Sequence, residues 1–283
     1  MAAKVPFMPH AQSPGETPSA PASSGVMPRP YQLSVAVLLL GAAAGGILGG
    51  MLSHSYFGTV AMEDMSEAFK EEAERIWPSL EFSAEANAEK ALKTRQHQLN
   101  NAYLGLGPAG AAVGGLIGLA AGLSRKSLRA MLTGLTVGVI AAVVGGLAAG
   151  FAGVEVAGRL ERYRIVAYDP VELTSAGIRE MYLGSTVQAA EWFLISLGTG
   201  LAVVLSGGSA KSFGRVAGFA VLGALAGTIC YTPVASAFFS AHGADSMVFP
   251  RGLAKQLTFV LLPSLGMALT IPRADDPPRN RQT

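Results

Sequence analysis

Long charge-free intervals alternate with short charged segments along this chain. No Asp, Glu, Lys or Arg occurs within residues 30–62, 96–124, 130–154, 192–210 or 216–244, and a shorter interval covers residues 256–272. About 20 apolar residues of helix cross the ~30 Å hydrocarbon core of a bilayer. The pattern therefore predicts an all-α integral membrane protein with a bundle of five to six transmembrane helices, near residues 31–53, 103–123, 128–151, 189–207, 215–239 and 255–271.

Two of these helices leave alternatives open. The interval near residues 255–271 is short and contains Pro263, so a re-entrant or interfacial segment is the alternative to a full span. The first helix, residues 31–53, is interpreted as a signal-anchor. Small residues at Ala42 and Ala44 make a cleaved secretory signal the alternative, although thirty residues precede the apolar stretch.

The segments between and beside the spans differ in composition. Residues 1–30 are rich in Pro, Ala and Ser and predict a disordered tail, because they contain too little apolar surface to offset the entropy of ordering. Residues 54–102 predict an acidic extramembrane helical segment, in which a second helix begins at Ser83 as N-cap. This segment is expected either to cover the outer face of the bundle or to bind a partner. Residues 273–283 form a basic C-terminal tail.

Glycines recur every four residues within the apolar intervals. Glycine disfavours a helix in water by about 0.8–1.0 kcal/mol relative to alanine, but in lipid it lets two helix backbones approach closely. The Gly-xxx-Gly spacing places these glycines on one stripe of each helix, as in a glycine zipper. The predicted helix-packing residues are Gly41, Gly45, Gly49, Gly110, Gly114, Gly118, Gly122, Gly134, Gly138, Gly146, Gly150, Gly214, Gly218, Gly223 and Gly227.

The stripes predict close packing but leave its partner open. They are expected to pack the helices of one monomer against each other within residues 103–272. In the alternative, the stripe of residues 103–123 faces a second copy of the chain and builds a homo-oligomer.

Basic residues set the expected orientation. The two shortest loops carry only positive charge, from Arg125, Lys126 and Arg129 in one and from Lys211 and Arg215 in the other. Cytoplasmic loops of membrane proteins are enriched in Lys and Arg. We therefore expect both termini to be cytoplasmic, in an integral protein of the cell membrane.

Composition narrows the function classes. Charged residues make up 14% of the chain, against about 25% in soluble domains. The net charge of +2 and the lack of a basic run exclude nucleic acid as an expected partner. The four histidines fall in separate segments, none with a metal-ligand spacing. We expect no catalytic constellation, no metal and no cofactor, and hence no enzyme.

The predicted helices also lack ionisable residues at their centres. Glu191 and Arg215 fall at predicted helix ends and are interpreted as interfacial. A helix break with a solute site is the remaining candidate, at Thr228, Cys230, Thr232 and Pro233, because proline frees a backbone carbonyl that polar side chains can satisfy.

These observations favour a structural or assembly component of a membrane, with the lipid bilayer and other membrane proteins or itself as partners. A passive channel or a secondary transporter for a neutral small solute is the alternative function, and membrane shaping by the helical hairpins is a third.

Overall fold

The computed structural model describes residues 33–59, 66–76, 83–166, 173–207, 212–239, 249–250 and 252–275. These residues form seven helices and no strand: α1 (Val35–Tyr56), α2 (Glu67–Ile76), α3 (Ala84–Ser124), α4 (Leu128–Val166), α5 (Leu173–Leu205), α6 (Phe213–Phe238) and α7 (Leu253–Asp275). The predicted N-terminal tail of residues 1–30 lies outside the described residues, as do residues 276–283 of the C-terminal tail.

Six of the seven helices are long and apolar enough to cross a membrane, namely all except α2. The prediction of an all-α fold is therefore confirmed for the described residues, and the six candidate spans are consistent with a helical membrane bundle. α7 continues as one helix through Pro263, and its apolar part, Leu253–Ala274, has 22 residues. This length suffices for a full span, so the structure gives no reason to treat α7 as a re-entrant segment.

Three helices extend well beyond the predicted spans. In α3 the helix predicted to begin after Ser83 and the span predicted from residue 103 are one helix, Ala84–Ser124. α5 begins at Leu173 instead of residue 189, and α4 continues to Val166 instead of residue 151. The lack of charge marks only the apolar part of a helix, whereas the hydrogen-bond ladder continues through residues that favour helix in water. The predicted N-cap of α3 is confirmed, because the Ser83 hydroxyl accepts a hydrogen bond from the Ala86 amide at 3.2 Å.

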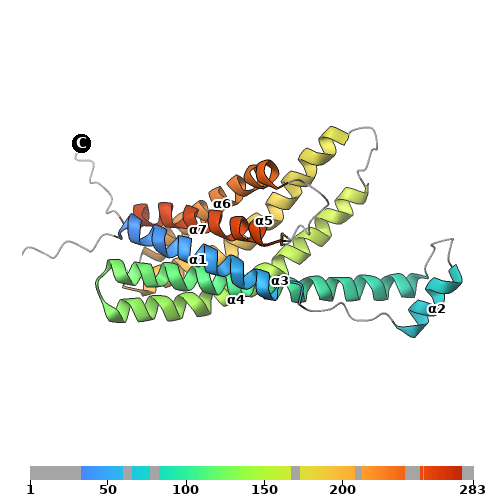
Figure 1. Ribbon diagram of the computed structural model, residues 1–283, viewed down its shortest axis with the longest axis horizontal. Coiled ribbons are helices and arrows are strands. Elements are labelled where there is room, and N and C mark those ends of the chain that lie inside the picture. Colours follow the sequence, from blue (N-terminus) through green and yellow to red (C-terminus); the bar gives the residue numbers. More distant parts are fainter. Residues whose placement is uncertain are drawn as a thin grey trace, which may run out of the picture. The chain divides into compact units, whose positions relative to one another are not determined.

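The spans run antiparallel to their main neighbours. Gly46 of α1 lies against Leu261 of α7, and Gly50, one turn later, lies against Leu257, one turn earlier. α3 is the most buried of the spans, with α1 and α4 as its main neighbours (Figure 1). This order gives the bundle two chemically different ends.

We call one of them the basic end, where α3, α5 and α7 finish and α4 and α6 begin. There the Arg125 guanidinium donates to the Val203 carbonyl at 2.8 Å and to the Ser206 hydroxyl. Arg215, at the start of α6, donates to the Ala274 carbonyl near the end of α7. These bonds join helix ends that are distant in the sequence. Arg215 therefore lies at a helix end, as the sequence predicts.

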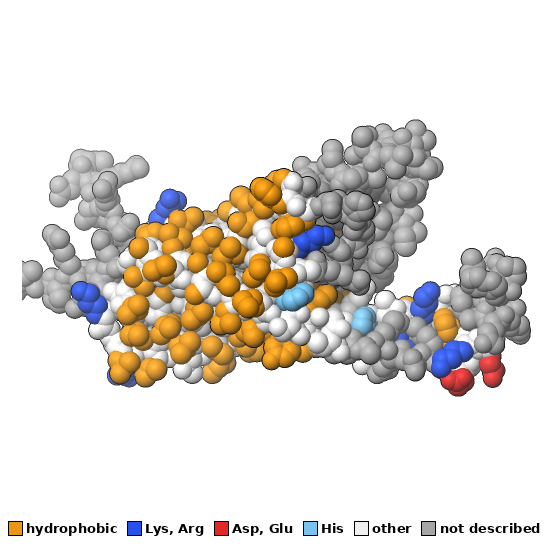
Figure 2. Space-filling model, viewed as in Figure 1, with side chains coloured by type: hydrophobic (Ala, Val, Ile, Leu, Met, Phe, Trp, Pro, Cys, Tyr) orange, Lys and Arg blue, Asp and Glu red, His pale blue; other side chains and the backbone are white. Residues whose placement is uncertain are grey.

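Apolar side chains face outward along the spans. Leu40, Ile140 and Ile229 are more than half exposed although they lie within the apolar helices. Figure 2 shows hydrophobic side chains over most of the visible face of the bundle, with Lys and Arg toward its ends. This distribution suits a surface that is covered by lipid.

α3 extends beyond the bundle as part of an arm, which we define as α2 together with residues 83–98 of α3 (Figure 1). At 1.5 Å per residue, the 41 residues of α3 measure about 60 Å, twice the ~30 Å hydrocarbon core. Arg95 of α3 pairs with Glu155 of α4 where the arm leaves the bundle. α3 is thus longer than a single membrane crossing requires.

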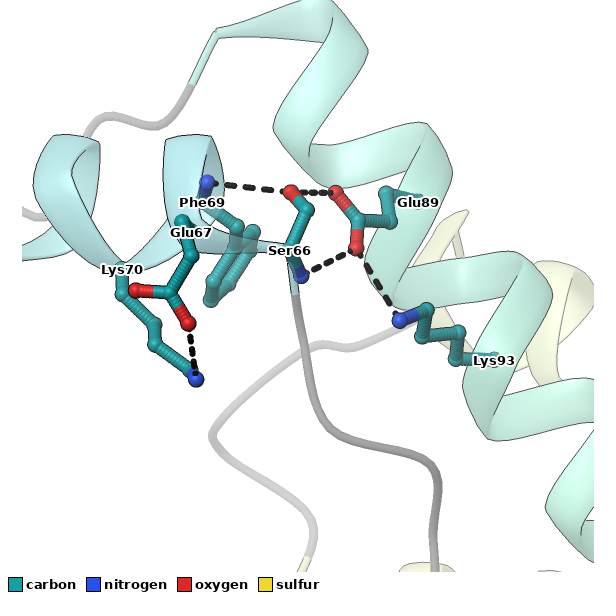
Figure 3. A network of polar contacts seen from close by, with 6 residues as sticks. All are labelled: Ser66, Glu67, Phe69, Lys70, Glu89 and Lys93. Atoms are coloured by element: carbon teal, nitrogen blue, oxygen red, sulfur yellow. Dashed lines mark hydrogen bonds and ion pairs between the residues drawn. The ribbon is translucent and has the colours of Figure 1, made fainter.

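Polar contacts hold α2 against α3 (Figure 3). The Glu89 carboxylate accepts from the Ser66 amide at 2.7 Å and from the Ser66 hydroxyl at 2.6 Å, and Lys93 lies 3.3 Å away. The hydrogen bonds from Ser66 lower the pKa of Glu89 below its ordinary value, and Lys93 adds to this effect. The Ser66 hydroxyl also accepts from the Phe69 amide and so caps α2.

Acidification should release α2 from α3. Because the pKa of Glu89 is lower with the contact formed than with it broken, the ionised carboxylate stabilises the contact above its ordinary pKa. This stabilisation disappears as the pH falls through the lowered pKa. Spin labels at Glu71 and Ala88, in a Cys230→Ser background, should show a narrow distance distribution at neutral pH and a broad one in acid.

Glu89→Gln is the matched control for this measurement. It should broaden the distribution at neutral pH, because the charge-assisted bonds are weakened, and should reduce the response to acid. Identical wild-type distributions at neutral and acid pH would contradict this role of Glu89.

Candidate functional site

Buried polar groups gather at the opposite end of the bundle, which we call the polar end. There the Ser53 hydroxyl of α1 donates to the Gly105 carbonyl of α3 at 2.5 Å. His54 of α1 lies 3.0 Å from the Gln256 Oε1 of α7, and the Gln256 Nε2 donates to the Pro250 carbonyl at 2.9 Å. These bonds tie α1 to α3 and α7.

The histidines that the structure describes take part in this network. Asn101 of α3 accepts from the Gly58 amide at 3.0 Å, and its Nδ2 lies 3.1 Å from the Nε2 of His97. His54 and His97 thus each contact an amide side chain, while His10 and His242 lie outside the described residues. The described residues contain no group of three or more His, Cys, Asp or Glu that could hold a metal ion.

An acidic side chain lies inside the bundle near this end. Glu191 of α5 is completely buried, and neither of its carboxylate oxygens has a hydrogen-bond partner among the described residues. The sequence places Glu191 at a helix end, and this part of the interpretation is wrong. α5 begins at Leu173, so Glu191 lies well inside this helix and within the candidate membrane span Gly184–Leu205.

Unpartnered polar atoms also occur on the same stretch of α5. The Oε1 of Gln188 and the Nε1 of Trp192 are buried without a hydrogen-bond partner among the described residues. Gln188 and Glu191 are three residues apart, a spacing that places two side chains on neighbouring positions of a helix surface. Ser185, one turn before Gln188, shares a hydrogen bond of 2.8 Å with Thr232 of α6. We call Gln188, Glu191 and Trp192 the α5 polar cluster.

Aromatic rings pack beside this cluster. The Phe259 ring of α7 lies 5.8 Å from Trp192, 5.4 Å from Tyr231 of α6 and 5.3 Å from Phe249, measured between centroids. Phe249 in turn lies 5.1 Å from Phe57. This aromatic layer joins α5, α6 and α7 and contacts the α5 polar cluster at Trp192.

The predicted packing glycines mostly lie between helices. An added Cβ at most of them would approach a neighbouring helix more closely than the 3.4 Å of ordinary contact. Gly41, Gly45 and Gly49 face α3; Gly110, Gly114, Gly118 and Gly122 face α4; Gly134, Gly138, Gly146 and Gly150 face α3; Gly223 and Gly227 face α7. Gly214 and Gly218 have nothing within 4 Å of an added Cβ.

The predicted helix-break residues point in different directions. α6 continues as a helix through Pro233, and Thr228 is buried with its hydroxyl donating to the Ala224 carbonyl at 2.9 Å. Cys230 and Pro233 are exposed on the outside of the bundle, whereas Thr232 faces Ser185 of α5. The four residues therefore do not converge on one point.

Cys230 should be protected from water-soluble reagents in a bilayer. Its side chain is exposed on the protein but lies on an apolar span, next to the lipid-facing Ile229. A membrane-impermeant maleimide should leave it unmodified in sealed liposomes and modify it after denaturation in detergent. Cysteine placed at Leu92 of the arm, in a Cys230→Ser background, is the accessible control. Rapid labelling of Cys230 from water would instead support an aqueous path along α6.

A polar cavity lies outside the bundle, between the arm and α4. It has a volume of about 560 Å³ and is lined by Lys90, Thr94 and Gln98 of α3 and by Glu155 and Gly158 of α4, among others. Its walls mix basic, acidic and amide groups, so its composition selects no particular ligand.

Comparisons with known proteins found no relative of this chain. No protein-family model matches the chain, and no curated protein or solved structure matches it either.

Proposed function

We propose that this protein is a non-enzymatic structural or assembly component of a membrane that holds a helical arm beside the lipid. The proposal rests on α3, a single helix that packs within the bundle and also supports the arm. Its residues Gly110 to Gly122 lie against α4, and its first turns pack against α2. A continuous helix keeps the arm in a fixed relation to the bundle, as expected of a platform that positions a partner.

Glycine stripes supply the rigidity in this proposal. Helices gain no hydrophobic free energy by associating in lipid, so close contact must hold them together. We propose that the Gly-xxx-Gly spacing of α3 and α4 serves this purpose within one chain. The stripe of α3 is already covered by α4, so it is not free to face a second copy.

We also propose that the basic end lies in the cytoplasm. Arg125, Lys126 and Arg129 flank the short connection between α3 and α4 at this end. The arm then projects from the outer face of the cell membrane. Leu38 and Ala42 of α1 are completely buried in the bundle, which supports a retained signal-anchor over a cleaved signal.

One face of the arm is suited to partner contact. Ala88, Leu92 and Gln96 are exposed and follow one another every four residues. Leu92 is 63% exposed although it precedes the apolar part of α3. A large apolar side chain at such a position is expected to be covered in an assembly.

Photo-cross-linking in intact cells tests the assembly role. A cross-linking amino acid at Leu92 or Gln96 should give one discrete protein adduct, the same from both positions. The control position is Ile140, which is 61% exposed on the apolar span of α4 and should contact lipid. An adduct of twice the 29.1 kDa chain mass would identify a second copy as the partner, and any other mass a different protein. If the arm positions give no protein adduct, the assembly role is wrong.

A secondary transporter is the second candidate, and Glu191 favours it. Ionisable residues inside membrane spans commonly mark ion or substrate paths. The sequence favours a neutral solute because it places no charge inside the spans. The buried Glu191 is an ionisable group within the bundle, so a charged solute is no longer disfavoured. Purified protein in liposomes should then dissipate an imposed pH or sodium gradient faster than protein-free liposomes. Equal rates would argue against transport.

A further inference from the structure

Glu191 lies where a bare carboxylate is costly. It belongs to the candidate membrane span of α5, Gly184–Leu205. The side chain is completely buried, and both of its oxygens are unpartnered among the described residues. A buried charge is stable only when it is neutralised or paired. The carboxylate therefore requires a proton or another positive charge at this point.

The α5 polar cluster as a whole also requires a proton or another positive charge. Gln188 Oε1 and the two Glu191 oxygens are acceptors, whereas the Nε1 of Trp192 is the single donor among the four unpartnered atoms. Three acceptors against one donor leave the cluster short of hydrogen or positive charge. A small cation would balance the cluster, whereas an anion would add to the excess of negative charge.

Close packing limits the size of the occupant. A Cβ at Gly153 of α4 would fall closer than 3.0 Å to the Glu191 Oε1 and 3.1 Å from its Cδ. The carboxylate is therefore pressed against the backbone of α4, and the Phe259 and Trp192 rings pack 5.8 Å apart nearby. We propose that Gln188, Glu191 and the backbone surface at Gly153 form an intramembrane binding site for a small monovalent cation, either a proton or a sodium ion.

No described side chain of opposite charge occupies this site already. The helices packed at this end do carry other titratable and charged groups: His54 on α1, Arg95, His97 and Tyr103 on α3, Glu155 and Arg159 on α4, Tyr231 on α6 and Lys255 on α7. None of these makes a hydrogen bond or ion pair with Glu191. The proposed site is independent of the assembly role of the arm and would be present in either proposed function.

Thermal unfolding of the full chain in detergent tests the site. A ligand that binds only the folded state raises Tm with its concentration. The Tm of the wild type should rise as the pH falls, or as sodium replaces choline at constant ionic strength. Above the dissociation constant we expect about 3–5 °C for each tenfold step in ligand concentration.

Two variants separate this effect from other titrations. Glu191→Gln keeps the shape of the side chain without its charge, and its Tm should lose the part of the dependence that belongs to this site. Glu155→Gln removes a carboxylate that pairs with Arg95 at the edge of the bundle. Its Tm should keep the wild-type dependence on pH and sodium. A response to pH alone identifies a proton, and protection by sodium but not choline identifies a sodium ion. Parallel responses in wild type and Glu191→Gln would overturn the proposal.

A second measurement needs no variant and decides the case if Glu191→Gln does not fold. Dicyclohexylcarbodiimide is apolar and modifies protonated carboxyl groups in apolar surroundings. Peptide mapping of the treated wild type should find Glu191 modified ahead of Glu155, with a rate that falls as the pH rises or sodium is added. Modification of Glu191 no faster than that of Glu155, at every pH and sodium concentration, would then overturn the proposal.

Discussion

Replacing Gly118 by alanine should strongly destabilise the bundle, although it adds only one methyl group. A Cβ at this position would fall closer than 3.0 Å to both the carbonyl oxygen and the carbonyl carbon of Gly134. These are backbone atoms, so no rotation of a side chain can relieve the overlap, and α3 and α4 must move apart. Inserting methylene groups into a packed core typically costs 1–3 kcal/mol, and we expect at least about 3 kcal/mol here because the obstacle is backbone.

Gly218→Ala is the matched control for this substitution. Gly218 belongs to the same predicted set and also lies within an apolar span, but nothing lies within 4 Å of its added Cβ. Its Tm in mild detergent should equal that of the wild type or exceed it slightly, because alanine favours helix over glycine. Equal losses of stability in the two variants would show that contact between α3 and α4 does not determine the result.

Phe259→Ala should have a comparably large effect on stability. Its ring contacts Trp192, Tyr231 and Phe249 and so joins α5 and α6 to α7. Phe→Ala substitutions in packed cores cost about 3–5 kcal/mol. In lipid this loss comes from the contacts that the ring makes within the bundle, because apolar side chains are equally well solvated by lipid tails.

Leu269→Ala on the same helix is the control. Leu269 is 51% exposed and faces outward from the apolar part of α7, so its loss removes few contacts within the protein. Its Tm should stay close to that of the wild type, whereas that of Phe259→Ala should fall by many degrees. If both variants lost stability equally, the general hydrophobicity of α7 would determine the stability of the bundle and the aromatic layer would not.

The spans could be predicted from the sequence because the bilayer imposes a length and excludes charge. This constraint acts on each helix separately, so intervals without charge suffice to find it. The ends of the helices could not be predicted in the same way. The Ser83 cap predicts where α3 begins, but no charge pattern shows that this helix continues without a break into the span.

The α5 polar cluster could not be predicted, for a related reason. Ser185, Gln188 and Glu191 lower the hydropathy before the most apolar part of α5, so the sequence suggests a membrane surface there. In the structure neighbouring helices shield these residues, and the contact of Ser185 with Thr232 is one example. A polar side chain facing another helix and one facing water look identical in a single sequence.

The spacing of glycines likewise predicts a groove on a helix surface, but not which neighbouring helix fills that groove. Gly114 and Gly218 each belong to a Gly-xxx-Gly pair, yet Gly114 faces Gly138 and Gly218 has no neighbour within 4 Å of an added Cβ. Which groove is filled depends on how the helices are ordered around α3, and this order follows from loop lengths and the sum of many contacts. A single helix carries too little information to specify it.

The continuous α3 has a mechanical consequence. From Ala84 to residue 103 the helix measures about 28 Å, so a tilt of about 10° inside the bilayer would swing its far end by roughly 5 Å. α3 thus acts as a rigid lever that pivots at its contact with α4. Lateral pressure in the lipid, or a ligand that changes this contact, would therefore displace the arm.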